Sequence, residues 1–174
     1  MLSRITNLRL ARNVKLIISM NTSTLKPTLS EYKNNDIAPH EVQSHLTLAK
    51  TLTLLGRVLY SSIFIFASFG HFTRGTIDYA AQQGVAYSEV LVPLSGILAL
   101  LGGLSILLGY RAKIGALLLI LFLVPVTLMM HNFWTVNDPA MHQLQMVMFM
   151  KNVSILGAAL IIFHFGSGPL SIKN

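Results

Sequence analysis

Apolar residues in this chain are gathered into four long blocks that short polar segments separate. The blocks cover about residues 52–72, 90–110, 112–130 and 146–165. Each is close to the roughly 20 apolar residues that an α-helix needs to cross the hydrocarbon layer of a membrane, where only a helix satisfies its own backbone hydrogen bonds. The second and third blocks lack the polar face that a soluble helical bundle would require. The pattern therefore predicts an all-α, integral membrane four-helix bundle.

The segment between the first two blocks predicts an additional short amphipathic helix outside the membrane. In TRGTIDYAAQQGVAYSE, Ile77, Ala80 and Ala81 recur at helical spacing, and Gly84 is placed to end the helix. The segment between the third and fourth blocks carries a turn signal at Asn137-Asp138-Pro139.

The distribution of Lys and Arg predicts the orientation, because these residues favour the cytoplasmic side of a membrane. The turn between the second and third blocks contains Arg111 and Lys113, and both ends of the chain carry further cations. The other two connections contain Arg74 and no other Lys or Arg. We therefore predict that both termini are cytoplasmic and that these two connections lie outside.

Residues 1–50 differ from the rest of the chain because they are polar and basic. We predict a disordered tail over 1–50 and a membrane domain over 51–174. Only 11% of the 174 residues are charged, against about 25% in soluble domains. The net charge is +7, but the basic residues are not combined with aromatic ones in the kind of surface that binds nucleic acid. The sequence therefore does not indicate a nucleic-acid partner. We expect a bacterial cytoplasmic (inner) membrane, or a mitochondrial inner membrane if residues 1–30 are a transit peptide.

Ionisable residues inside a span are candidates for function, because burying them in lipid is costly. Arg57 is such a cation on the inner side of the first block. His71, His131, Lys151 and Asn152 are predicted to form a polar cluster on the outer face. Such a cluster could hold a quinone, relay protons or bind a metal. The histidine spacing matches no metal signature, whereas His71 and His131, if they lie at matching depth, could hold a haem between two helices. No catalytic motif is present, so the sequence favours a protein without independent catalytic activity.

Small residues favour close helix packing on faces of the second and fourth blocks. They are Ser95, Ala99, Gly102, Gly103 and Gly157. The pattern predicts that these two blocks meet, and a pore or ligand groove along the small face is the alternative.

The order of several motifs resembles the DoxX family of small four-helix membrane proteins. The motifs are GRVLYSSIFIFASFGHF, DYAAQQGV, LLGGLSILLG before a basic turn, HNFW, and MKNVSILG, within about residues 55–172. Arg57, Lys151 and Asn152 match the family pattern. Two positions depart from it: Ala99, where members often carry a carboxylate, and His71, where they often carry Lys.

The resemblance implies an accessory or anchoring subunit of a membrane oxidoreductase system, with a quinone as the implied cofactor. Its partners would be the lipid bilayer, a membrane or redox protein, and a second copy of the chain. Two alternatives remain from the residues themselves: a small-solute transporter or channel, and a structural membrane protein without a ligand.

Overall fold

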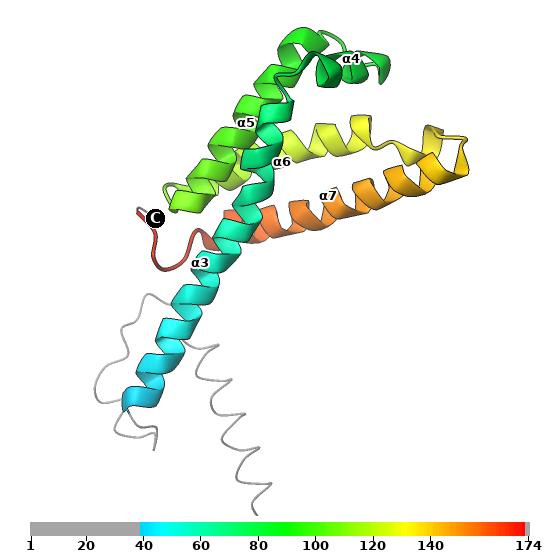
Figure 1. Ribbon diagram of the computed structural model, residues 1–174. Helices are drawn as coiled ribbons and strands as arrows, with labels where there is room; N and C mark the ends of the chain where they lie inside the picture. Colours follow the sequence, from blue (N-terminus) through cyan, green and yellow to red (C-terminus); the bar gives the residue numbers. More distant parts are fainter. Residues whose placement is uncertain (1–38, 173–174) are drawn as a thin grey trace, which may run out of the picture. The chain divides into compact units, whose positions relative to one another are not determined.

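The computed structural model describes residues 39–172, and every regular element in this range is a helix (Figure 1). The elements are α3 (Pro39–Gly70), α4 (Arg74–Gln82), α5 (Ser88–Leu108), α6 (Ala112–Met130), the 3-10 helix η1 (Phe133–Thr135) and α7 (Pro139–Phe165). Within the described residues, four segments are long and apolar enough to cross a membrane. They are Gln43–Gly70, Ser88–Leu108, Ala112–Thr135 and Pro139–Phe165. The predicted four-helix membrane fold is confirmed.

The predicted boundaries hold best for the central helices. α6 begins and ends where predicted, whereas α3 and α7 begin well before residues 52 and 146. At α7, the Asp138 carboxylate accepts a hydrogen bond from the Met141 N–H (2.8 Å), and Pro139 occupies the first turn. A proline is favourable there because its missing N–H would have no helical partner. The Asp-Pro pair therefore begins a helix instead of forming an isolated turn.

The helical start of α3 also corrects the predicted tail, because residues 39–50 are helical. Many of these residues are polar, so hydropathy alone does not distinguish a polar helix end from a disordered tail at residues 39–50. The remainder of the predicted tail, including the hypothesis of a transit peptide, lies outside the described residues. The chain divides into two units, of which Leu48–Asn174 contains the packing of the four spans.

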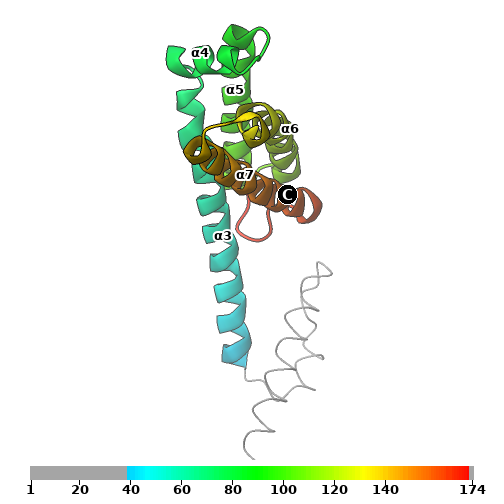
Figure 2. The ribbon, with the colours of Figure 1, turned by 90° about the vertical axis from the view of Figure 1, so that its right-hand side faces the viewer.

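The short external helix is present as α4, which packs against α5 (Figure 2). It ends at Gln82, two residues before Gly84, whose φ of 83° lies in the left-handed region that glycine favours. The Val85 N–H donates to the Ala80 carbonyl (3.0 Å), which closes the end of the helix. Ile77 and Ala80 are buried against Val92 at the start of α5. The amphipathic pattern therefore predicted the helix and the burial of Ile77 and Ala80, whereas Ala81 is exposed.

A tight turn joins α5 to α6. Gly109 has a φ of 65°, and the Tyr110 N–H donates to the Ser105 carbonyl (3.0 Å). The Ser105 hydroxyl donates in return to the Tyr110 carbonyl (2.6 Å). These bonds satisfy backbone groups that the helix end would otherwise leave unpaired. The basic turn that marks the predicted cytoplasmic side is thus held rigidly between the two spans.

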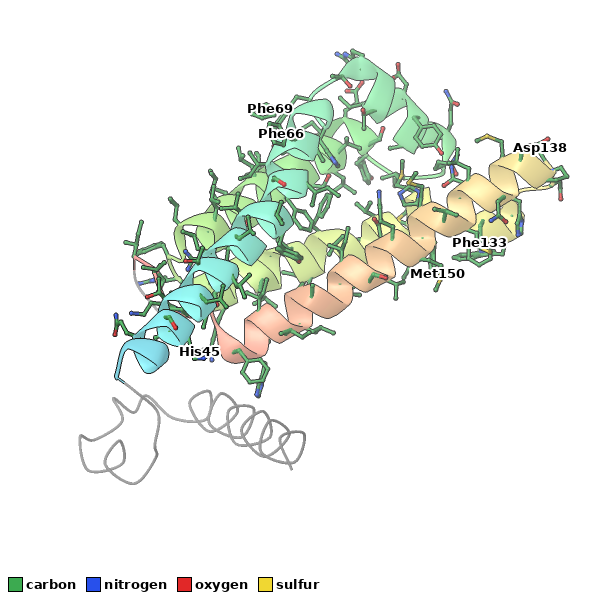
Figure 3. All side chains as sticks on the ribbon, turned by 60° about the horizontal axis from the view of Figure 1, so that its bottom comes forward. His45, Phe66, Phe69, Phe133, Asp138 and Met150 are labelled. Atoms are coloured by element: carbon green, nitrogen blue, oxygen red, sulfur yellow. The ribbon has the colours of Figure 1, made fainter. Side chains whose placement is uncertain are left out.

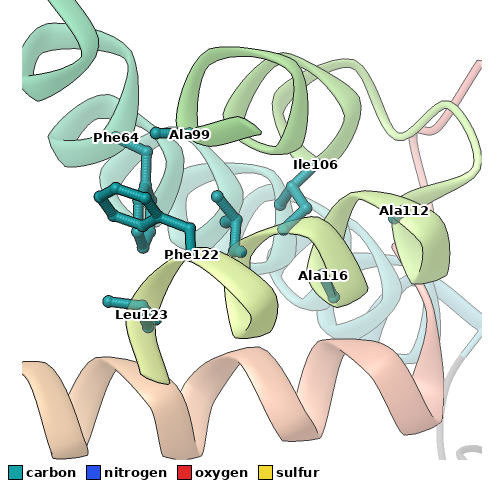
Figure 4. Packing of buried hydrophobic residues seen from close by; sticks show 8 residues of the cluster. Phe64, Ala99, Ile106, Ala112, Ala116, Phe122 and Leu123 are labelled. Atoms are coloured by element: carbon teal, nitrogen blue, oxygen red, sulfur yellow. The ribbon is translucent and has the colours of Figure 1, made fainter. Parts of the chain in front are cut away.

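The main hydrophobic core joins α3, α5 and α6 (Figure 4). Its buried members are Phe64, Ala99, Ile106, Ala112, Ala116, Leu119, Phe122 and Leu123. Ile155 and Leu156 of α7 pack against this cluster, and α6 contacts both α5 and α7. Because several core members are alanines, the helix backbones approach closely, as small residues allow in membranes.

Candidate functional site

One face of α3 is buried although it is partly polar. Its buried residues are Arg57, Ser61, Phe64 and Ser68, which recur every three or four positions and so lie on one side of the helix. Phe66 and Phe69 lie on the exposed side (Figure 3). Arg57, Ser61 and Ser68 therefore face protein, together with Phe64, whereas Phe66 and Phe69 face outward.

Arg57 binds the segment that follows α7, residues 166–172, which we call the C-terminal segment. Its Nη2 donates to the Leu170 carbonyl (2.7 Å), and its Nη1 donates to the Ser167 and Pro169 carbonyls (3.3 and 3.4 Å). A methyl group on Gly109 would lie 2.6 Å from Nη1, so only glycine leaves room for the guanidinium. Arg57 is 5% exposed, which shows that it does not extend to the surface as a snorkelling side chain would.

His71 lies just beyond the end of α3 and contacts α5 and α6. Its Nδ1 is 2.9 Å from the Ser95 hydroxyl, and its ring meets Phe122 edge-on at 5.5 Å between centroids. A methyl group on Gly96 would lie 2.7 Å from the His71 Cβ. Burial lowers the pKa of His71 below the ordinary histidine value, and a hydrogen bond to the Val92 backbone partly opposes this effect.

His131 connects the end of α6 with α7 and α4. Its Nδ1 is 2.8 Å from the Gln145 Oε1, and the Gln145 Nε2 donates to the Tyr79 hydroxyl (3.3 Å). The two connections that were predicted to share one side of the membrane therefore contact each other.

Lys151 and Asn152 are adjacent in α7 but face different surroundings. Asn152 is buried, at 7% exposure, whereas Lys151 is exposed. The Lys151 Nζ contacts the Met148 sulfur at 3.4 Å. Among the described side chains, Arg74 and Glu89 form a salt bridge (3.2 Å). Lys151 forms no salt bridge with a described residue.

One side of α7 has no partner in the described part of the chain. We call it the outward face, and it consists of Val147, Met150, Lys151, Ser154, Gly157 and Ile161, all exposed. The buried residues of α7, Asn152 and Ala159, lie on the opposite side. Met150 projects from the helix in Figure 3. A methyl group on Gly157 would have no neighbouring atom within 4 Å, so this shallow place on the helix is open.

The predicted packing residues of α5 divide between two neighbouring helices. Gly103 faces α3, where an added methyl group would lie 3.3 Å from the Ser61 carbonyl. Gly102 faces α6, where it would meet Leu119 at 2.6 Å. Ser95 pairs with His71, and Ala99 is fully buried in the core. A methyl group on Gly157 would have no neighbour within 4 Å, so this residue does not pack against the second span as predicted.

The members of the predicted outer cluster do not form hydrogen bonds with one another in the described residues, and His71, His131 and Lys151 each contact a different residue. Residues 39–172 also contain no group of three His, Asp or Glu side chains that could hold a metal ion. A common ligand for the four residues stays a prediction.

Sequence reasoning missed the buried hydroxyl residues of the described structure. They are Ser61, Ser68, Ser88, Thr127 and Ser167. The Ser61 and Thr127 oxygens have no hydrogen-bond partner in the described structure. Ser61 and Ser68 follow Arg57 at helical spacing, and this periodicity is the signal that could have placed them on the buried face.

Four spans, a short external helix and a buried arginine that binds the end of the chain define a small multi-pass integral membrane protein. The SURF4 family model matches residues 5–174, nearly the whole sequence. The chain therefore belongs to the SURF4 family.

Two relatives from Escherichia coli cover most of the membrane domain. The chain is 28% identical to the inner membrane protein YphA over 125 residues, which are 71% of this chain and 89% of that protein. It is 32% identical to the inner membrane protein YqjF over 125 residues, 70% of this chain and 88% of the relative. It is also 29% identical to the Saccharomyces cerevisiae ER-derived vesicles protein ERV29 over 78 residues, 45% of this chain and 25% of ERV29. No solved structure matches.

The comparison overturns the assignment to the DoxX family, because the family model that matches is SURF4. The implied oxidoreductase role rested on that assignment and loses its support with it. Ala99 and His71 are therefore no longer departures from a family pattern that the chain would be expected to follow. Both have structural surroundings of their own, in the core and against Ser95 respectively.

Proposed function

We propose that this protein is an anchoring or accessory subunit that holds another membrane protein in the bilayer through the outward face of α7. The observation that carries the proposal is the exposure of this face, which combines an unpaired cation with an open glycine. Helices associate in membranes mainly through close packing and polar contacts. The outward face offers a small residue for close packing and a charged group for a polar contact, and no described residue of the chain covers it. It is therefore suited to contact a second protein.

We further propose that the protein resides in a bacterial cytoplasmic (inner) membrane with both termini inside. The support is that YphA and YqjF are both named inner membrane proteins and that most of their length is covered. The mitochondrial alternative finds no support among these relatives. ERV29 is named for ER-derived vesicles, which indicates a membrane protein but names no partner.

A channel along the small face of α5 is less well supported. A methyl group on Gly102 would meet Leu119 at 2.6 Å, and one on Gly96 would meet His71 at 2.7 Å. Protein atoms thus occupy the space beside these glycines, where a solute path would need water or an open groove.

Photo-cross-linking in native membranes tests the proposed function. A photoreactive amino acid is placed at Ser154 on the outward face, and separately at Gly56, an exposed α3 glycine that also has no atom within 4 Å of an added methyl group. We expect a protein adduct of defined mass from position 154 and lipid adducts alone from position 56. Lipid adducts alone from both positions would overturn the proposal.

A further inference from the structure

We propose that Arg57 binds a phosphate group, of a membrane lipid or of free inorganic phosphate, and that the C-terminal segment is a lid over this site. In the structure, carbonyl oxygens of the lid occupy the guanidinium. A phosphate group takes their place when the lid opens. The outward face of α7 has no part in this site, so the site is independent of the proposed function.

The contacts of Arg57 place it at one end of the bundle. Its Nη1 lies beside Gly109, in the turn that joins α5 to α6, and its carbonyl partners follow α7. The C-terminal segment runs beside the same turn, since the Ile172 N–H donates to the Leu108 carbonyl (3.2 Å) (Figure 1). The ends of three spans therefore meet at the level of Arg57, and opening of the lid brings its guanidinium within reach of head groups and dissolved anions.

Arg57 has no carboxylate partner in the described part of the chain. The acids of residues 39–172 are Glu41, Asp78, Glu89 and Asp138. Asp78, Glu89 and Asp138 lie at the opposite end of the spans, and Glu41 precedes Arg57 by about 24 Å along α3. Carbonyl dipoles offset a positive charge only in part, and a buried charge is costly without an opposite one. A bound anion supplies the missing charge.

The guanidinium also retains an unused donor. The Arg57 Nε–H is buried and has no hydrogen-bond partner in the described structure. One turn further along the same side of α3, the Ser61 hydroxyl is likewise buried without a partner there. Arginine binds two oxygens of a phosphate through parallel N–H donors, and Nε and Nη2 form such a pair. Because the Leu170 carbonyl occupies Nη2 alone, a ligand with two adjacent oxygens satisfies more of the guanidinium than the lid does.

The end of the C-terminal segment is suited to move aside. Leu170 accepts the shortest bond from Arg57, yet its φ of 55° lies in the left-handed region, which is unfavourable for a residue with a side chain. Strained backbone of this kind is concentrated at ligand sites and switches. The side chains of Leu170 and Ile172 are more than half exposed, so their burial does little to hold the lid. Opening therefore relieves strain at a small cost in buried apolar surface.

Cations at this end of the bundle favour anionic ligands. Arg111 and Lys113 follow Gly109 in the α5–α6 turn, and both are exposed. Basic residues at a membrane surface attract anionic head groups. These two cations raise the local concentration of anions, and the buried guanidinium of Arg57 provides the specific contact.

The first experiment measures lipid binding to the full-length protein in dodecyl maltoside, a detergent without phosphate. Native mass spectrometry compares phosphatidylglycerol with a diacylglycerol of the same acyl chains, which lacks the phosphate. We expect the protein to retain phosphatidylglycerol in preference. Arg57→Gln should weaken this binding about tenfold, the size of one hydrogen bond to a charged group. Arg74→Gln removes an equal charge from the other end of the bundle and should leave the affinity unchanged.

A second experiment follows the lid. The chain contains no cysteine, so Ser171→Cys provides a single thiol for a water-soluble maleimide. Phosphatidylglycerol should speed the labelling and diacylglycerol should not, because only a phosphate displaces the carbonyls. Leu170→Pro should strengthen phosphatidylglycerol binding, since proline cannot adopt the left-handed φ of the closed lid. Ile172→Ala, which changes an exposed side chain of the same segment, should leave the binding unchanged.

Inorganic phosphate distinguishes the two sources of the ligand. Faster labelling with inorganic phosphate supports a free anion, and faster labelling with the lipid alone supports a head group. The proposal is overturned if neither source speeds the labelling of position 171. This outcome is decisive even where Arg57→Gln fails to fold, because the labelled protein carries Arg57. A preference for phosphatidylglycerol that survives Arg57→Gln also overturns the site, and an affinity that Leu170→Pro leaves unchanged overturns the lid.

Discussion

Gly102 of α5 and Gly115 of α6 face each other at backbone distance. A methyl group on Gly102 would lie 2.9 Å from the Gly115 carbonyl oxygen, and one on Gly115 would lie 3.0 Å from the Gly102 carbonyl oxygen. Each glycine thus makes room for the backbone of the other helix. Because backbone cannot rotate away as a side chain can, this contact sets how closely the second and third spans approach.

Gly102→Ala should therefore destabilise the protein, whereas Gly157→Ala should not. We expect Gly102→Ala to cost about 1–3 kcal/mol, the usual effect of overfilling a packed interior. Gly157→Ala should be neutral or slightly stabilising, because alanine is the better helix former and the position is open. Unfolding of the purified protein by sodium dodecyl sulfate, followed by circular dichroism, measures both. Equal stability of the two variants would show that the Gly102–Gly115 approach is not a constraint.

Arg57→Met should release the C-terminal segment. The substitution removes the donors of three carbonyls and should lower stability by about 1–3 kcal/mol. Since the chain contains no cysteine, Ser171→Cys introduces a single thiol whose labelling by a water-soluble maleimide reports on the segment. We expect faster labelling in Arg57→Met. Arg74→Gln, which breaks an exposed ion pair, is the control and should leave the rate unchanged.

The stability of the protein should depend on pH through His71. Burial lowers the pKa of His71 below 6.5, so the unfolded chain takes up a proton at this position more readily than the folded one. Between the lowered pKa and 6.5, stability should rise with pH and fall as the solution is acidified. Detergent unfolding from pH 5 to 7.5 measures this slope. His71→Gln should flatten it, and an unchanged slope would contradict the role of His71.

The orientation of the spans predicts the behaviour of reporter fusions. A reporter active only in the periplasm should be active when it follows Gly84 and silent when it follows Tyr110, because the basic turn favours the cytoplasm. The reverse pattern would refute the proposed topology.

The sequence predicted the spans well because lipid imposes a strong requirement on composition. α6, for example, is apolar from Ile114 to Met130 apart from Thr127, and the sequence predicted its bounds directly. Polar helix ends carry no such signal, so the starts of α3 and α7 were missed. At α7, Asp138-Pro139 is compatible with a turn and with a helix start, and only the Met141 hydrogen bond distinguishes them.

The candidate site was less predictable, because it depends on which side of each helix finds a neighbour. Lys151 and Asn152 are consecutive and looked equivalent in sequence, yet one is exposed and the other buried. Arg57 was recognised as a cation within a span. Its carbonyl partners lie in a Gly- and Pro-containing segment with no charge pattern to mark it, so no sequence signal connected the two.

The distance along the chain between Arg57 and Leu170 has a consequence for biogenesis. The two residues are 113 positions apart, so the first span leaves the ribosome long before the carbonyls that bind its guanidinium exist. During insertion, this cation has to be hydrated or sheltered by the insertion machinery. The finished contact forms after the fourth span has entered the bilayer, and it thereby marks a chain that has been synthesised through its last helix.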